Sequence, residues 1–344
     1  MHPVPDSLYP DEPDTRRFTE ILDWAANWFN VLPLPEAVER LRSGSLPDRA
    51  AAITFDDGYA DNCVVALPIL RQHGMHATFF VATAFMNGGR MFNDTVIEAV
   101  RRVATPEFDL EGAKLGVFRT GSLAEKRETV EAILDRIKYL PQGERDDAVN
   151  AIKAAAGVPL PDDLMMSDDQ VRRLRDAGME IGAHTRTHPI LARCTPSVAE
   201  AEIANGRDDL GALLGRPPRL FAYPNGKPGR DYAPSHVDMV KRLGFEAAVS
   251  TSPGAARTGD DAFELPRFTP WARRRLQFGV RLRRISPRIG RPAQRSSRSE
   301  VSSSAAERFQ MKPHRERRAA CWRSAADPAI CRPCVKRFFR PSSS

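Results

Sequence analysis

The sequence lacks the long apolar runs and the cysteine framework that mark membrane proteins and small secreted domains. Nothing in its 344 residues approaches the roughly 18 consecutive apolar residues of a membrane span. The first residues, Met1 to Asp6, have neither the basic nor the apolar region of a secretory signal. The five cysteines are scattered, and their spacing indicates no disulfide pattern. As written, the sequence predicts a cytoplasmic chain without a membrane span.

Negative charge outweighs positive charge over most of the chain, although the formal net charge is +7. Residues 273–344 contain 20 Lys+Arg and 4 Asp+Glu, whereas residues 1–272 carry a net charge of −9. Because residues 286–344 are rich in Ser, Arg and Pro, we expect them to form a disordered tail. Such a tail is either solvated and without function or a weak contact for nucleic acid. A nucleic-acid-binding function rests on this tail alone.

The rest of the chain alternates short apolar segments with amphipathic ones. Strands are expected at residues 29–34, 50–55, 77–82, 179–183, 219–223 and 247–251. The expected helices are residues 18–28, 35–42, 62–73, 167–177, 197–214 and 235–243. The fourth helix carries a capping box, Ser167 with Gln170. Repeated strand-then-helix order predicts an α/β fold with a parallel sheet and right-handed crossovers.

Three segments set the expected domain boundaries. Residues 1–49 are expected to pack on a main domain, residues 50–285, as an N-terminal segment. Residues 92–157 show helical periodicity with little strand character, so a helical insertion is expected over about residues 92–165. The tail at 286–344 completes the chain.

Two acidic residues directly follow the first buried strand of the main domain. Asp56 and Asp57 precede Gly58, so we expect them at the carboxyl rim of the sheet, where parallel α/β folds place their active sites. Adjacent carboxylates are costly to ionise and desolvate together unless a cation compensates them. A metal ion is the simplest compensation. Taken alone, Asp-Asp-Gly also fits a turn with side-chain to backbone hydrogen bonds.

Two histidines follow another buried strand in the same way. His184 and His188 are four residues apart, and a helical turn between them would bring their imidazoles together. A lone histidine would more often be structural. Two histidines and one carboxylate with an open position form a usual catalytic arrangement for zinc and similar divalent ions.

These motifs carry a specific resemblance. Thr-Phe-Asp-Asp-Gly at 54–58 and His-Thr-Arg-Thr-His at 184–188 resemble the motifs of the polysaccharide deacetylases, the NodB-homology group of carbohydrate esterase family four. The resemblance implies a distorted seven-stranded TIM-like (β/α) barrel and a hydrolase that removes N-acetyl groups from the amino sugars of a polysaccharide. It also implies a divalent metal, zinc first, with cobalt or nickel as alternatives. By position, Asp56 resembles the general base, and the metal ligands would be Asp57, His184 and His188.

The family's third motif is matched only in part at residues 221–226. Ala222 stands where many relatives have an arginine that orients the base. The resemblance implies that Tyr223, or a backbone N–H near Asn225, contacts substrate and stabilises the oxyanion. A packing role for Tyr223 is the alternative.

A later segment is again similar to the family. Arg267 is expected to replace the absent arginine by pairing with Asp56. Trp271 is expected to line the sugar subsite. The family's Leu-x-His general-acid motif is missing, since no histidine lies between His236 and His314. The donor of the leaving-group proton is therefore unassigned.

These departures keep other interpretations open. The missing general acid and Ala222 also fit a non-catalytic carbohydrate-binding relative of the deacetylases. Relatives usually open with an apolar first strand that this sequence does not show, so an open sheet edge or barrel seam is expected. A truncated gene start would explain this and would allow an envelope-associated location. In each case the expected partner is a polysaccharide or oligosaccharide with N-acetylated amino sugars.

Overall fold

The computed structural model describes residues 5–10, 12–269 and 275–285; Trp271, His314 and the predicted tail lie outside these ranges. The strands are β1 (Asn30–Val31), β2 (Ala50–Ala51), β3 (Ile53–Phe55), β4 (Ala77–Val81), β5 (Glu107–Leu110), β6 (Gly116–Arg119), β7 (Glu180–Ala183), β8 (Leu220–Ala222), β9 (Ala247–Pro253) and β10 (Leu265–Arg267). The α-helices are α1 (Thr15–Trp28), α2 (Leu34–Ser43), α3 (Leu67–Gln72), α4 (Phe92–Arg102), α5 (Leu123–Ile137), α6 (Gln142–Ala156), α7 (Asp168–Asp176), α8 (Pro196–Leu214), α9 (Pro234–Arg242) and α10 (Arg275–Ile285).

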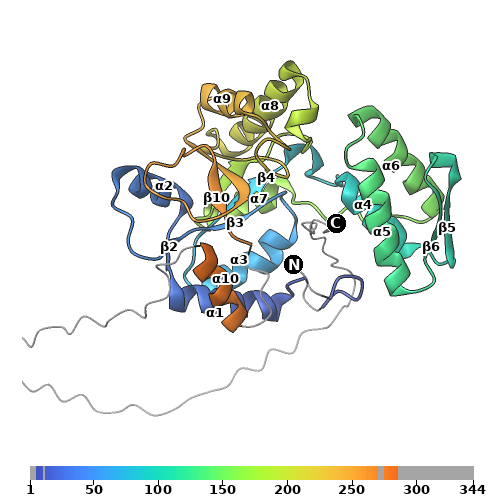
Figure 1. The fold of residues 1–344 in the computed structure, drawn as a ribbon, viewed down its shortest axis with the longest axis horizontal. Helices are drawn as coiled ribbons and strands as arrows, with labels where there is room; N and C mark the ends of the chain where they lie inside the picture. Colours follow the sequence, from blue (N-terminus) through green and yellow to red (C-terminus); the bar gives the residue numbers. More distant parts are fainter. Residues whose placement is uncertain (1–4, 11, 270–274, 286–344) are drawn as a thin grey trace, which may run out of the picture.

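Six parallel strands form the central sheet, in the order β10-β9-β8-β7-β4-β3. Helices connect consecutive strands, as predicted: α3 joins β3 to β4, α8 joins β7 to β8, and α9 joins β8 to β9. Figure 1 shows the helices around the sheet, with the insertion set to one side. The short strand β1 pairs in parallel with β2, which directly precedes β3. The predicted parallel α/β barrel is confirmed, in the form of a curled sheet.

The two edge strands of this sheet, β3 and β10, meet through side chains. Within the described residues no backbone ladder joins them, so the barrel has the open seam that the sequence led us to expect. Arg267 at the end of β10 donates a hydrogen bond to the Thr54 hydroxyl of β3 at 3.3 Å, and it also bonds Asp56 just beyond β3. The seam is therefore bridged at its carboxyl end, beside the acidic motif.

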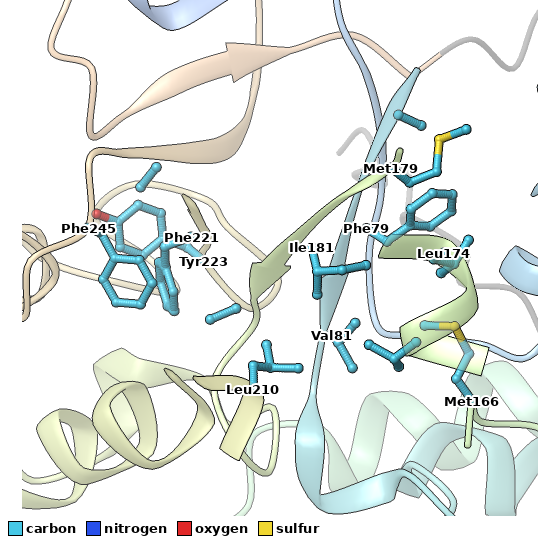
Figure 2. Close-up of a cluster of buried hydrophobic side chains, with 14 of the residues drawn as sticks. Phe79, Val81, Met166, Leu174, Met179, Ile181, Leu210, Phe221, Tyr223 and Phe245 are labelled. Carbon is cyan, nitrogen blue, oxygen red and sulfur yellow. The ribbon is translucent and has the colours of Figure 1, made fainter. Parts of the chain in front are cut away.

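Alternate strand residues pack on opposite faces of the sheet, as the pleat requires. Phe79 and Val81 belong to the large core between the sheet and the helices, whereas Phe80 packs inside the curl with Leu220 and Val249. Figure 2 shows the first of these cores, where aliphatic and aromatic side chains from strands and helices meet. Because of this alternation, a residue's position in its strand determines whether its side chain points to the inner or the outer face of the curled sheet.

The insertion, α4 to α6, differs from its prediction because it contains an antiparallel hairpin, β5 with β6. Phe108 and Leu110 of β5 face a separate hydrophobic core, but Val117 of β6 is 52% exposed. Strands of only four residues give little strand signal in the sequence. The insertion is thus mainly helical, as its periodicity indicated, but it includes a short hairpin that the sequence did not indicate.

The N-terminal segment packs on both parts of the molecule. Phe18 and Leu22 of α1 contact the core of the main domain, and Leu8 lies in the core of the insertion. Asp6 is buried and pairs with Arg101 of α4 through two hydrogen bonds of 2.8 and 2.7 Å. The expected packing on the barrel is thus only part of its role.

Helix ends follow their local signals. The capping box predicted before α7 is present: the Ser167 hydroxyl accepts from the Gln170 N–H, and the Gln170 side chain accepts from the Ser167 N–H.

Among the described helices, none combines the length and apolar composition needed to cross a membrane.

Candidate metal and catalytic site

Three side chains converge at the carboxyl rim of the sheet. Asp57 follows β3, and His184 and His188 follow β7. The Oδ1 atom of Asp57 lies 3.4 Å from His184 Nε2 and 3.3 Å from His188 Nε2. All three residues are buried, and their ligand atoms lie within 4.8 Å of one another. Two imidazole nitrogens and a carboxylate oxygen this close fit a single divalent cation.

A backbone hydrogen bond orients the imidazole of His184. Its Nδ1 atom lies 2.7 Å from the carbonyl oxygen of Ala222. Because a carbonyl oxygen only accepts, Nδ1 carries the proton and the Nε2 lone pair faces Asp57. Metal-binding histidines are usually held in this way. The contact uses the main chain of Ala222, so it does not depend on the arginine found there in many relatives.

The two histidines are brought together by a loop, not by the helical turn that their spacing would also allow, since residues 184–188 form no helix. Thr185 and His188 both have left-handed backbone, with φ of 61° and 56°. The His188 N–H donates to the Thr185 hydroxyl at 3.1 Å and closes the loop. A β-branched residue rarely adopts positive φ. Such strain persists where the surrounding structure enforces it, as it often does at functional sites.

Gly58 allows the acidic motif to pass close to β4. Asp57 and Gly58 have φ of 80° and 90°. A Cβ atom on Gly58 would lie 2.9 Å from Cγ1 of Val81. Glycine is therefore required here both for its conformation and for space.

Asp56 and Arg267 form the ion pair that the sequence analysis predicted. The guanidinium donates two hydrogen bonds of 2.7 Å, one to each carboxylate oxygen. Arg267 is held in turn by the carbonyl oxygen of Ser250 at 2.8 Å. Burial tends to raise the pKa of Asp56, but the positive charge of Arg267 and the hydrogen bonds that it donates lower this pKa below its ordinary value. Asp56 is thus a carboxylate at neutral pH, as a proton acceptor must be.

Tyr223 packs in the core, and its predicted role as a side-chain donor to an oxyanion is not supported. Its ring is fully buried, stacks on Tyr232 with centroids 3.8 Å apart, and meets Phe221 edge-on. It lies among the core side chains of Figure 2. Strand alternation places Ala222 inside the curl and Tyr223 outside. Asn225, by contrast, is half-buried on the loop after β8, with φ of 59°.

Glu202 of α8, which the sequence analysis missed, holds the histidine loop. Its carboxylate accepts hydrogen bonds from the Arg186 and Thr187 N–H groups at 3.1 and 2.7 Å, and from the Thr187 hydroxyl at 2.8 Å. One turn further on, Gly206 lets the helix touch the same loop: a Cβ there would lie 2.6 Å from the carbonyl carbon and oxygen of Thr185. In the sequence, Glu202 and Gly206 look like ordinary residues of an amphipathic helix, so no local pattern marks them as part of the site.

Replacing Glu202 by alanine is expected to lower metal affinity about ten- to hundredfold, because partners outside the ligand set typically contribute that much. Metal titration followed by calorimetry measures the effect. Glu200→Ala is the matched control, since Glu200 lies on the same helix and, among the described residues, forms an exposed pair with Arg242 at 3.5 Å and no other ion pair. Equal affinities in the two variants would contradict the role of Glu202.

Gly206→Ala is expected to destabilise the protein by about 1–3 kcal/mol and to weaken metal binding, because the new methyl group overlaps backbone atoms that cannot rotate away. Thermal melting with and without metal measures both effects. Gly211→Ala in the same helix is the control: its Cβ would make only ordinary contacts, the nearest 3.5 Å from Pro217. That variant is expected to be unchanged or slightly stabilised by better helix propensity.

Comparison with known proteins identifies a family for the chain. Residues 43–248 match the model of the polysaccharide deacetylase family. YxkH of Bacillus subtilis, a protein classed with the polysaccharide deacetylases, is 21% identical over 242 residues, which are 70% of this chain and 59% of that protein. The chain thus spans less than two thirds of this relative's length.

A solved structure with a TM-score above 0.5 shows the same fold. IcaB from Ammonifex degensii is 20% identical with a TM-score of 0.52, over 80% of this chain and 93% of that one. The Streptococcus pyogenes deacetylase PplD is 19% identical with a TM-score of 0.49, over 74% and 80% of the two chains. The family model matches more than half of this chain, so the chain belongs to the polysaccharide deacetylase family.

Proposed function

We propose that the protein is a metal-dependent hydrolase that removes N-acetyl groups from the amino-sugar residues of a polysaccharide. The observation that carries the proposal is the convergence of Asp57, His184 and His188 directly beside the Asp56–Arg267 pair. Family membership supplies the reaction class. Among the described residues, Asp57, His184 and His188 are possible metal ligands, and the ionised base Asp56 lies next to them in the chain.

The ligand set fits a divalent cation. The Nε2 lone pair of His184 is fixed toward Asp57 by the bond to Ala222, and two imidazoles with one carboxylate suit zinc, with cobalt or nickel as alternatives. When bound, such a cation supplies positive charge that polarises an amide carbonyl and promotes the ionisation of water. Asp57, His184 and His188 would hold it.

The other residues then have separate tasks. Asp56 accepts the proton of the attacking water as the carbonyl carbon becomes tetrahedral. Arg267 keeps the Asp56 carboxylate ionised and fixes its orientation through two hydrogen bonds. The N–H of Asn225, which has no hydrogen-bond partner in the described part of the chain, is positioned on the loop after β8 to stabilise the oxyanion.

Metal analysis combined with acetate release from several N-acetylated glycans tests the proposal. We expect about one equivalent of metal per chain and metal-dependent acetate release from at least one glycan. Removal of the metal with a chelator should stop the release, and zinc should restore it. A metal-loaded protein that binds glycans but releases no acetate would instead support the alternative, a non-catalytic carbohydrate-binding relative.

A further inference from the structure

Three cationic side chains gather around Tyr139, outside the metal and catalytic site. The guanidinium carbons of Arg230 and Arg193 lie 5.1 and 5.7 Å from the centre of its ring, and Nζ of Lys138 lies 5.6 Å from it. Arg230 also donates a hydrogen bond to the Tyr139 hydroxyl. Both arginines are exposed. We call these four residues the Tyr139 cluster.

The arginines of the Tyr139 cluster stand on the two loops that also carry the candidate site. Arg193 lies five residues after His188, and therefore within about 18 Å of it along the chain. Arg230 lies on the loop after β8. The two loops are joined, because the Ala192 N–H donates to the Asp231 carbonyl oxygen at 2.9 Å. The cluster is thus tied to the rim at which the proposed reaction takes place.

The charge of the two arginines is not balanced by a neighbouring carboxylate. Neither Arg193 nor Arg230 forms an ion pair within the described ranges. The adjacent Asp231 is 2% exposed, and its carboxylate accepts a hydrogen bond from the Lys227 N–H at 3.1 Å. Two exposed guanidinium groups side by side, without a carboxylate partner among the described residues, favour an anion that can lie between them.

We propose that the Tyr139 cluster is a subsite for the carboxylate groups of the substrate, which is an anionic polysaccharide that combines N-acetylated amino sugars with acidic sugars. The proposal rests on the proposed deacetylase function. Guanidinium groups bind carboxylates through paired hydrogen bonds. Cation–π contacts with Tyr139 hold the two arginines together before the glycan arrives. The anionic units bind beside the reacting sugar.

Two oligosaccharides of equal length test the subsite: an alternating copolymer of N-acetylglucosamine and glucuronic acid, and a neutral N-acetylglucosamine oligomer. With zinc-loaded protein, we expect tighter binding and a higher kcat/KM for the copolymer. In the double variant Arg193→Ala/Arg230→Ala, the preference for the copolymer should fall about tenfold. That is the summed binding free energy of two exposed charge pairs, expressed as a ratio of affinities. In the wild type, 0.5 M salt should remove most of it, because salt screens exposed charges.

Two further variants complete the test. Arg257→Ala removes an exposed arginine from the loop after β9, which is not part of the cluster, and should leave the preference unchanged. Arg193→Lys/Arg230→Lys should keep part of it and shows that the fold tolerates changes at both positions.

The outcomes separate the two proposals. Equal binding of both oligosaccharides by the wild type, or an unchanged preference in the double alanine variant, overturns the subsite even if acetate is released. Selective binding of the copolymer without any acetate release supports the subsite and contradicts the deacetylase function.

Discussion

Asp57→Asn is expected to abolish stable metal binding and, with it, acetate release. Asparagine tolerates the positive φ of 80° at this position, so the backbone should be unaffected. The change removes the only charged ligand of the three. Because partners outside the ligand set already contribute about ten- to hundredfold to affinity, loss of a ligand should cost more than about a hundredfold.

Metal content after dialysis against metal-free buffer measures this directly, and acetate release is measured in parallel. Asp169→Asn is the control, because the Asp169 side chain on α7 is 93% exposed and pairs with Arg172 at 2.9 Å. It should retain both metal and activity. Full metal occupancy in Asp57→Asn would show that this carboxylate is not a ligand.

Asp56→Asn is expected to give the opposite pattern, a protein that keeps its metal but turns over about 10²–10⁴ times more slowly, the usual contribution of a general base. The substitution preserves shape, and its amide oxygen still accepts a hydrogen bond from Arg267. The ligand atoms of Asp57, His184 and His188 are unchanged. What is lost is the capacity to accept a proton.

The measurement is kcat for acetate release together with metal content and melting temperature. A normal kcat in Asp56→Asn would refute the assignment of the base. A variant that loses both metal and activity would mean that Asp56 helps to build the metal site. Arg267→Lys provides a further comparison: lysine keeps a positive charge but cannot donate the two parallel hydrogen bonds of 2.7 Å, so kcat should fall while metal content stays the same.

Much of the fold and of the metal site follows from local patterns. Apolar segments of strand length, each followed by an amphipathic helix, predict a parallel sheet, and the structure contains one. Since the carboxyl ends of parallel strands lie at one rim, residues that directly follow two strands must come near each other. Asp57 follows β3 and His184 follows β7, so their proximity could be predicted even though they are far apart in the sequence.

Strand alternation also contained a signal about Tyr223 that the sequence analysis did not use. Phe221 and Tyr223 are separated by one residue, so both side chains leave β8 on the same face. Both lie in the core between the sheet and the helices. Their shared apolar character already favoured packing over catalysis.

Other features depend on contacts that no local pattern records. The loop from His184 to His188 has left-handed residues where a helical turn was expected, because Glu202 and Gly206 of a distant helix set its course. Tyr139 of the insertion meets Arg230 of the β8 loop, 91 residues away. Periodicity shows which face of a helix or strand is buried, but not which loop it will contact.

The sequence by itself determined the order of strands and helices, the position of the acidic and histidine motifs at strand ends, and their chemistry. These depend on side-chain periodicity and residue type, which are local properties. Only the tertiary structure decided how the imidazoles are oriented, how Glu202 holds the histidine loop, and where arginines without a carboxylate partner gather. These depend on distances between residues far apart in the chain, and such distances are set when the whole core packs.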